Sequence, residues 1–202
     1  MGLFSRTRSG DNPPEWLVLG LGNPGQKFAR TRHNVGEDAV RLLADRHHAT
    51  LKSGKNDAFV AEARIDGVRC VLAVPITFMN ESGRAAASLV SRFGITGAER
   101  IIVVHDELDL EPGTVKVKQA GGLAGHNGLR SITAHLSTQD YLRVRIGVGR
   151  PPSREGGADY VLSKVPKAAR EVLDVAIEVA ADAVEQIINE GVDAAMRTVN
   201  AR

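Results

Sequence analysis

Residues 16–25 read Trp-Leu-Val-Leu-Gly-Leu-Gly-Asn-Pro-Gly, a short apolar run that ends in a glycine-rich loop. The apolar run predicts a buried β-strand. The loop has the G-x-G-x-x-G spacing of a dinucleotide site, but such a site needs a helix that begins inside the loop and meets a pyrophosphate. Asn23-Pro24-Gly25 is instead a turn tripeptide, so we expect no helix there. The hypothesis of a nucleotide-dependent oxidoreductase therefore rests on the glycine spacing alone. The loop is better interpreted as the end of a strand that presents the Asn23 amide.

Composition limits the class of protein. The chain has 202 residues, 43% of them hydrophobic, a net charge of +2 and one cysteine, Cys70. This length suits one domain with its own core. No apolar run approaches the roughly 20 residues that span a membrane, and the sequence shows no secretory signal pattern. A single cysteine cannot form an internal disulfide. We therefore expect a cytoplasmic protein. The small net charge excludes a uniformly basic coat but leaves room for a local basic patch.

The rest of the chain alternates between strand and helix patterns. Strands are predicted over 59–65, 69–74, 100–104, 115–118 and 143–148, and helices over 35–48, 81–93, 129–136 and 166–190. The alternation indicates one α/β domain over residues 15–202, with a sheet that is partly antiparallel at its hairpins. Residues 1–14 have little to bury and are expected to form a disordered extension, and 150–157 a mobile loop.

The helix patterns predict three further details. Asn34 is the expected N-cap of the helix over 35–48. Pro166 suits the first position of the long C-terminal helix. The buried stripe of that helix is expected to comprise Val172, Ala176, Val179, Ala183 and Ile187.

Polar side chains gather where the predicted strands end. Asn23 follows the first strand, Asn80 follows the strand over 69–74, and residues 105–109 follow the strand over 100–104. The glycine-rich segment 121–128 ends in His126-Asn127-Gly128. Ligand sites in α/β sheets form at the carboxyl ends of strands, so these groups could converge on one pocket.

His33 is the candidate base. It lies just before the predicted helix over 35–48, whose positive N-terminal end should keep the imidazole neutral and therefore able to accept a proton. Asp106 could accept the Nδ1 proton of His33 and orient its ring. The ordinary alternatives are a surface or capping histidine and a solvated acidic loop. A metal site at Asp106, Glu107 and Asp109 is a further alternative, although it lacks a histidine cluster at a defined spacing.

Asparagines and basic strand faces supply the remaining candidates. Asn23, Asn80 and Asn127 could each simply form a turn or cap a helix, but an asparagine can also bind a peptide amide or polarise a carbonyl without adding charge. Lys116 and Lys118 share one face of a predicted strand, and Arg143 and Arg145 share one face of another. Such a row suits the phosphates of a nucleic acid, and the alternative is a pair of solvated strand faces.

Six blocks of the sequence, taken together, resemble the bacterial peptidyl-tRNA hydrolase family. They are Gly-Leu-Gly-Asn-Pro-Gly (20–25), Thr-Arg-His-Asn (31–34), Thr-Phe-Met-Asn-Glu-Ser-Gly (77–83), His-Asp-Glu-Leu-Asp-Leu (105–110), Gly-Gly-Leu-Ala-Gly-His-Asn-Gly-Leu (121–129) and Arg-Ile-Gly-Val-Gly-Arg-Pro (145–151). Blocks in one order are far more specific than any single motif, and the resemblance runs from about residue 16 to the last predicted helix.

The resemblance implies a monomeric cytoplasmic esterase that cleaves the ester between a stalled peptide and the 3′ ribose of tRNA. It implies no metal and no cofactor. The expected fold is a three-layer α/β sandwich in which helices flank a twisted mixed sheet, similar to the purine nucleoside phosphorylase group. A relative of this fold that binds RNA without catalysis is the alternative.

The resemblance also assigns roles. His33 would activate water, Asp106 would hold His33, and Asn23 would recognise the blocked, peptide-like amide. The implied substrate-binding residues are completed by Phe28, Phe78, Met79, Asn80 and Asn127. Phe28 stands where the family often has tyrosine, so any contact of that hydroxyl is lost here, and Ile76 also departs from the common pattern.

Overall fold

The computed structural model describes residues 12–151 and 157–202. Most of the expected disordered extension and most of the expected mobile loop therefore lie outside the described residues. Asn12, inside the expected extension, already contacts the domain, because its carbonyl accepts a hydrogen bond from the Arg69 guanidinium.

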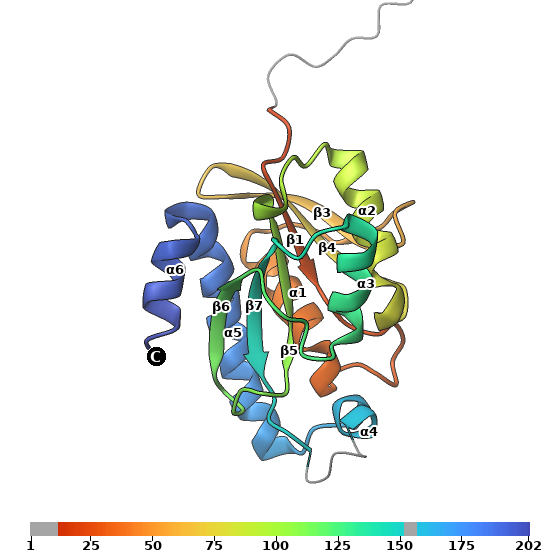
Figure 1. Cartoon of the computed structure of the whole chain (residues 1–202), viewed down its shortest axis with the longest axis vertical. Helices are drawn as coiled ribbons and strands as arrows, with labels where there is room; N and C mark the ends of the chain where they lie inside the picture. Colours follow the sequence, from red (N-terminus) through yellow and green to blue (C-terminus); the bar gives the residue numbers. More distant parts are fainter. Residues whose placement is uncertain (1–11, 152–156) are drawn as a thin grey trace, which may run out of the picture.

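Within the described ranges, seven strands form one mixed sheet in the order β2-β3-β4-β1-β5-β7-β6 (Figure 1). The strands are β1 (Trp16–Gly20), β2 (Lys52–Ser53), β3 (Ala58–Ile65), β4 (Val68–Pro75), β5 (Ile101–Glu107), β6 (Val115–Gln119) and β7 (Leu142–Gly147). The neighbouring strands β4, β1, β5 and β7 run parallel, whereas β2, β3 and β6 are added antiparallel at the two sides. The four parallel strands therefore present their carboxyl ends at one edge of the sheet, where ligand sites form in such folds.

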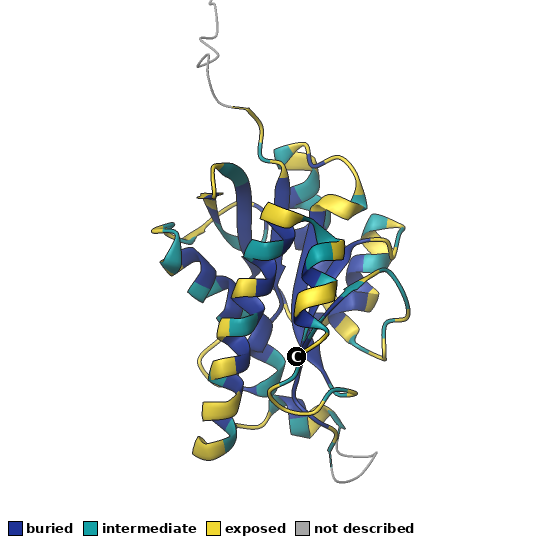
Figure 2. Ribbon diagram, turned by 90° about the vertical axis from the view of Figure 1, so that its left-hand side faces the viewer, coloured by how far each residue is buried: buried dark blue, intermediate teal, exposed yellow. Residues whose placement is uncertain are grey.

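Helices cover both faces of the sheet. They are α1 (Val35–Arg46), α2 (Ser82–Phe93), α3 (Asn127–Leu136), α4 (Gly157–Leu162), α5 (Lys167–Glu190) and α6 (Val192–Val199), with short 3-10 turns η1 (Arg32–Asn34), η2 (Met79–Glu81) and η3 (Ala98–Arg100). Because strand side chains alternate between faces, Leu17 and Leu19 of β1 pack with α2 and α3, whereas Trp16 and Val18 pack with α1 and α5. Figure 2 shows the buried strands enclosed between helices whose outer faces are exposed. The predicted three-layer α/β sandwich is confirmed.

Several details differ from the sequence-based expectations. β5 continues through Glu107 rather than ending at residue 104, so 105–107 are part of the strand. Pro166 is the N-cap of α5 rather than its first residue, and Val172, expected in the buried stripe, is 43% exposed. None of the described helices is long and apolar enough to cross a membrane.

A glycine allows α1 to begin close to the sheet. A Cβ at Gly36 would lie 2.1 Å from the carbonyl oxygen of Val104, and a Cβ at Gly20 would lie 2.4 Å from the carbonyl oxygen of Gly36. Real Cβ atoms do not approach that closely, so only glycine lets this helix start against β1 and β5. The close approach brings η1, which immediately precedes α1, to the carboxyl end of β5.

Candidate active site

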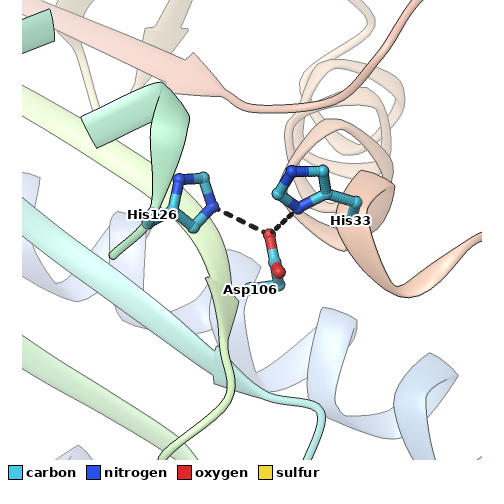
Figure 3. A group of neighbouring side chains, drawn as sticks. All are labelled: His33, Asp106 and His126. Atoms are coloured by element: carbon cyan, nitrogen blue, oxygen red, sulfur yellow. Dashed lines mark hydrogen bonds and ion pairs between the residues drawn. The ribbon is translucent and has the colours of Figure 1, made fainter. Parts of the chain in front are cut away.

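A histidine and an aspartate from distant parts of the chain meet at the carboxyl edge of the sheet. His33 lies in η1, and its Nδ1 is 2.9 Å from Oδ1 of Asp106, near the end of β5 (Figure 3). Since a carboxylate only accepts hydrogen bonds, Nδ1 is the donor and Nε2 of the neutral ring keeps its lone pair. Asp106 is buried, and the side chain of His33 is 12% exposed. The predicted pairing of these two residues is confirmed in its geometry.

Burial and the neighbouring Asp106 shift the pKa of His33 in opposite directions. Burial alone would lower the pKa of His33, but the charge and the hydrogen bond of Asp106 outweigh it and raise this pKa above its ordinary value. Burial would raise the pKa of Asp106, yet His33 and His126 together hold it well below the usual range. The adjacent carboxylate therefore opposes the expected effect of the helix end, because it favours the imidazolium relative to a free histidine.

His126 joins the pair from the other side. Its Nε2 is 2.9 Å from the same Asp106 oxygen, and its ring centroid lies 5.1 Å from that of His33. Its Nδ1 accepts the backbone N–H groups of Gly128 and Leu129, at 3.1 and 3.4 Å. These donors place the proton of the neutral ring on Nε2, which therefore donates to Asp106.

A second buried histidine lies beneath this group. The Nδ1–H of His105 donates to the backbone carbonyl of Asp106 at 2.7 Å, and its ring lies edge-on to that of His126. Burial, together with the nearby His126, lowers the pKa of His105 to about 3. His105 therefore stays uncharged and supports the end of β5 from within.

The Asn23 side chain is fixed in one orientation. Its Oδ1 accepts the backbone N–H of Met79 at 2.8 Å, so its NH₂ group is left to donate. The loop around Asn23 is held by Asn34, whose Oδ1 accepts the Asn23 N–H at 3.0 Å and whose Nδ2 donates to the Asn23 carbonyl at 2.9 Å. Asn34 occupies the predicted N-cap position of α1, but its side chain makes no capping bond there and its amide instead braces the loop.

These groups open into one cavity of about 740 Å³. Its lining includes every residue expected to act on the substrate, namely Asn23, Phe28, His33, Phe78, Met79, Asn80, Asp106 and Asn127. Phe78 is 54% exposed, unusual for a large apolar side chain. The helix α4, which the sequence did not predict, supplies a further apolar wall through Ala158, Val161 and Leu162.

The model of the peptidyl-tRNA hydrolase family matches residues 17–202 of the chain. The chain belongs to the peptidyl-tRNA hydrolase family. It is 49% identical to the peptidyl-tRNA hydrolase of Frankia casuarinae, over 96% of this chain and 98% of that protein. It is 48% identical to that of Nocardia farcinica, over 91% and 95% of the two chains.

Solved structures agree with this membership of the hydrolase family. The crystal structure of peptidyl-tRNA hydrolase from Acinetobacter baumannii has a TM-score of 0.88 and 38% identity, and covers 95% of this chain and 98% of that one. The structure of 5′-methylthioadenosine nucleosidase from Arabidopsis thaliana, at 10% identity and a TM-score of 0.51, shares the fold alone.

The other asparagines of this hydrolase-family chain lie at the cavity rim. Asn80 and Asn127 are both exposed. Neither caps a helix, because Glu81 precedes α2 without a capping bond and His126 caps α3. The helix-capping alternative for these two amides is therefore wrong, and both side chains remain available to a ligand, although Oδ1 of Asn127 also accepts from Arg130 at 3.3 Å.

The predicted row of basic residues is only partly at the surface. The β6–β7 register pairs Lys116 with Arg145 and Lys118 with Arg143. Arg143 is 2% exposed and donates to the backbone carbonyls of Gly121 and Gly122. Arg145 binds Glu107, and the Lys116 ammonium donates to the carbonyl of Asn200 at 2.6 Å. The alternative of a solvated strand face is therefore wrong for Arg143, and its guanidinium faces the glycine loop instead of the surface expected to bind phosphates.

The acidic cluster is also divided. Glu107 pairs with Arg145 at 3.0 Å and Asp109 pairs with Arg150 at 2.8 Å, so neither joins Asp106. Among the residues that the structure describes, His33, Asp106 and His126 form a group that could hold a metal ion, since their ligand atoms lie within 4.8 Å of one another.

The role of His126 was not assigned from the sequence. The Gly-His-Asn-Gly block at 125–128 could have indicated this role. A histidine at the N-terminus of a helix can accept hydrogen bonds from backbone N–H groups through one ring nitrogen and donate one through the other.

Proposed function

We propose that this chain hydrolyses the ester bond between a peptide and the 3′ ribose of tRNA, with His33 as the general base and Asp106 as the residue that orients it. The single observation that carries the proposal is the 2.9 Å contact between His33 Nδ1 and Asp106 at the wall of the cavity. That contact leaves Nε2 of His33 unprotonated in the neutral ring and able to accept a proton from water.

The reaction needs one water molecule. His33 Nε2 takes its proton while the oxygen attacks the ester carbonyl, and Asp106 stabilises the imidazolium that forms. The tetrahedral intermediate then breaks the bond to the ribose oxygen, which receives the proton from Nε2. The peptide leaves with a free carboxylate and the tRNA with a free hydroxyl. A positioned base of this kind contributes about 10²–10⁴-fold to the rate.

Asn23 is proposed to bind a carbonyl oxygen of the substrate. Because Met79 occupies Oδ1 of Asn23, the free part of the amide is a donor, which suits the peptide carbonyl or the developing oxyanion rather than a peptide N–H. Recognition of the blocked amide would then run through its carbonyl. An unblocked aminoacyl group has no such carbonyl on its amine and offers a positive charge instead.

The remaining cavity residues are proposed to hold the peptide and the tRNA end. Phe28, Phe78 and Met79 offer apolar surface for the peptide, and Asn80 and Asn127 offer polar contacts at the rim. Among the basic residues, Lys118 and Arg145 are the better candidates for tRNA phosphates, because Arg143 is enclosed and Lys116 is bonded to the C-terminal segment.

We further propose that no metal ion takes part and that the chain acts as a monomer in the cytoplasm, where translation takes place. In the neutral rings, Nδ1 of His33 and Nε2 of His126 both donate to the same carboxylate oxygen, so a metal ion would have to displace both protons before it could bind these nitrogens. A chelator should leave turnover unchanged, and inhibition reversed by added metal would contradict this. Sedimentation should give one 21.6 kDa species, and a stable dimer would contradict the monomer.

The experiment that tests the function compares two substrates, an N-acetylated aminoacyl-tRNA and the same aminoacyl-tRNA with a free amine. The proposal predicts hydrolysis of the first and little of the second. Binding of the tRNA without release of the blocked amino acid would instead support the non-catalytic RNA-binding alternative.

A further inference from the structure

Arg143 is a buried cation whose hydrogen-bond partners are all neutral. It lies on β7, is 2% exposed, and donates to the Gly122 carbonyl at 2.7 Å and to the Gly121 carbonyl. The Tyr141 ring lies 5.1 Å from its guanidinium carbon. Among residues 12–151 and 157–202, no carboxylate forms an ion pair with it. Burying a charge is costly unless hydrogen bonds compensate it. The two carbonyl contacts supply such hydrogen bonds, while the Glu107 carboxylate attracts the guanidinium from a distance and Arg145 repels it.

The loop that receives these bonds is in an unfavourable backbone conformation. Four of its residues have positive φ: Ala120 (58°), Gly121 (94°), Ala124 (48°) and Gly125 (73°). Glycine adopts such angles easily, but alanine does not. The two alanines therefore keep this conformation only because the surroundings impose it, and Arg143 makes the side-chain contacts to the loop's carbonyls.

The loop leads directly to the catalytic carboxylate. Four residues after Gly122 comes His126, whose Nε2 donates to Asp106 at 2.9 Å. Ala124, Gly125 and His126 also line the cavity. A displacement of the loop would remove one of the two histidine hydrogen bonds to Asp106 and alter the cavity wall.

We propose that Arg143 is a positioning residue: it holds the loop over residues 120–126 so that His126 donates to Asp106. This inference rests on the proposed function and adds a residue that acts through the loop rather than on the substrate. It also replaces the direct phosphate contact first expected of Arg143, because the guanidinium faces two backbone carbonyls.

The test uses Arg143→Lys and Arg143→Met, each alone and combined with His126→Ala. We expect kcat to fall at least about tenfold in both single variants. Methionine has no donor, and a lysine ammonium cannot reproduce the planar guanidinium that donates to two carbonyls at once. In the His126→Ala background the further loss should be smaller than about threefold, as for residues that act through one another. The midpoint of the pH–rate profile should rise, as in His126→Ala, because Asp106 with one donor fewer holds the His33 proton more strongly.

Salt dependence separates positioning from phosphate binding. Loss of a phosphate contact weakens tRNA binding and reduces the slope of log(kcat/KM) against log[salt] by about one. Positioning leaves that slope unchanged in the Arg143 variants. Lys118→Gln is the positive control, in which the slope should fall.

The matched control is Arg170→Met. Arg170 is another buried arginine, bonded to Asp38 and Asp174 between α1 and α5 and away from the cavity. We expect this variant to lose thermal stability but to keep kcat and the pH midpoint of the wild type.

Three results would overturn the proposal. The first is an equal loss of kcat in the wild-type and His126→Ala backgrounds, and the second is a reduced salt slope with kcat preserved. The third is failure of both Arg143 variants to fold while Arg170→Met folds, which would make Arg143 a residue of the fold as a whole. Wild-type protein that is inactive on the blocked substrate would refute the hydrolase instead. In that case, amide shifts confined to residues 120–127 in Arg143→Lys would still support the contact with the loop.

Discussion

Asn23 and Met79, 56 residues apart in the chain, are joined by a 2.8 Å hydrogen bond from the Met79 backbone N–H to Oδ1 of Asn23. The bond connects the loop after β1 to the turn after β4, and both border the cavity. It also fixes which half of the amide faces a ligand, because the oxygen is already occupied.

This bond predicts the effect of Asn23→Asp. The carboxylate can still accept from Met79, so the fold should be retained, but the donor is lost and a negative charge faces the developing oxyanion. We expect kcat to fall on the order of 10²–10³-fold with little change in melting temperature. Turnover of the blocked aminoacyl-tRNA measures kcat, and thermal unfolding measures the melting temperature. A kcat near that of the wild type would show that Asn23 does not stabilise the transition state.

The raised pKa of His33 predicts the pH dependence of turnover. Since the base must be unprotonated, the rate should increase with pH through the pKa of His33, at a midpoint above the ordinary value of about 6.5. Asp106→Asn removes the charge that raises this pKa, so the midpoint should fall and kcat should drop by roughly 10²–10⁴-fold. A midpoint unchanged by this substitution would show that another group controls the profile.

The same shift affects stability. A histidine whose pKa is higher in the folded state than in the unfolded state adds to the free energy of unfolding. This contribution is complete at pH values below the unfolded pKa of about 6.5, and it is lost as the pH rises through the folded pKa. Unfolding by denaturant, measured on both sides of this window, should therefore show a loss of stability with rising pH that is absent in His33→Ala.

The exposed Phe78 ring predicts a change in binding rather than in stability. The ring borders the cavity and is 54% exposed, so Phe78→Ala should raise KM for a substrate with an apolar amino acid and leave kcat nearly unchanged. Its unfolding free energy should change by less than about 0.5 kcal/mol, as for other surface substitutions. Val175→Ala, at a 65% exposed position on α5, is the control and should change neither. A fall in kcat with KM unchanged would contradict a binding role.

Gly36→Ala should damage the fold that positions His33. The added Cβ would lie 2.1 Å from the Val104 carbonyl oxygen, and relief of this overlap should cost about 1–3 kcal/mol, as in other overpacked sites. Gly54→Ala is the matched control, because its Cβ would have no neighbour closer than 3.7 Å. Equal stability of the two variants by denaturant unfolding would contradict the close packing of α1 on the sheet.

Local patterns in the sequence account for much of the fold. The apolar run at 16–20 and the period-two strands at 115–118 and 143–148 determine their own conformation, so the order of the main strands and helices could be predicted. The shortest elements could not, because β2 has two residues and α4 six, too few to establish a period. The end of β5 was missed because His105, Asp106 and Glu107 are polar yet buried.

Site residues could be predicted where they lie directly at the end of a predicted strand or at the start of a predicted helix. Asn23 and His33 stand at such ends, and the resemblance of the surrounding blocks related them to Asp106. Arg143 was not predictable, because period-two alternation shows which face it shares with Arg145 but not that the 121–122 carbonyls fold over that face. The double use of His126, as helix cap and as donor to Asp106, likewise depends on a contact between residues 20 apart in the chain.

Single-turnover hydrolysis of a blocked aminoacyl-tRNA by His33→Ala measures how much of the reaction depends on His33 as the base. His48→Ala, which removes an exposed histidine outside the cavity, is the control. We predict that His33→Ala binds the tRNA as the wild type does but hydrolyses it at least about 10²-fold more slowly, while His48→Ala is unchanged. Hydrolysis by His33→Ala at the wild-type rate would contradict the mechanism.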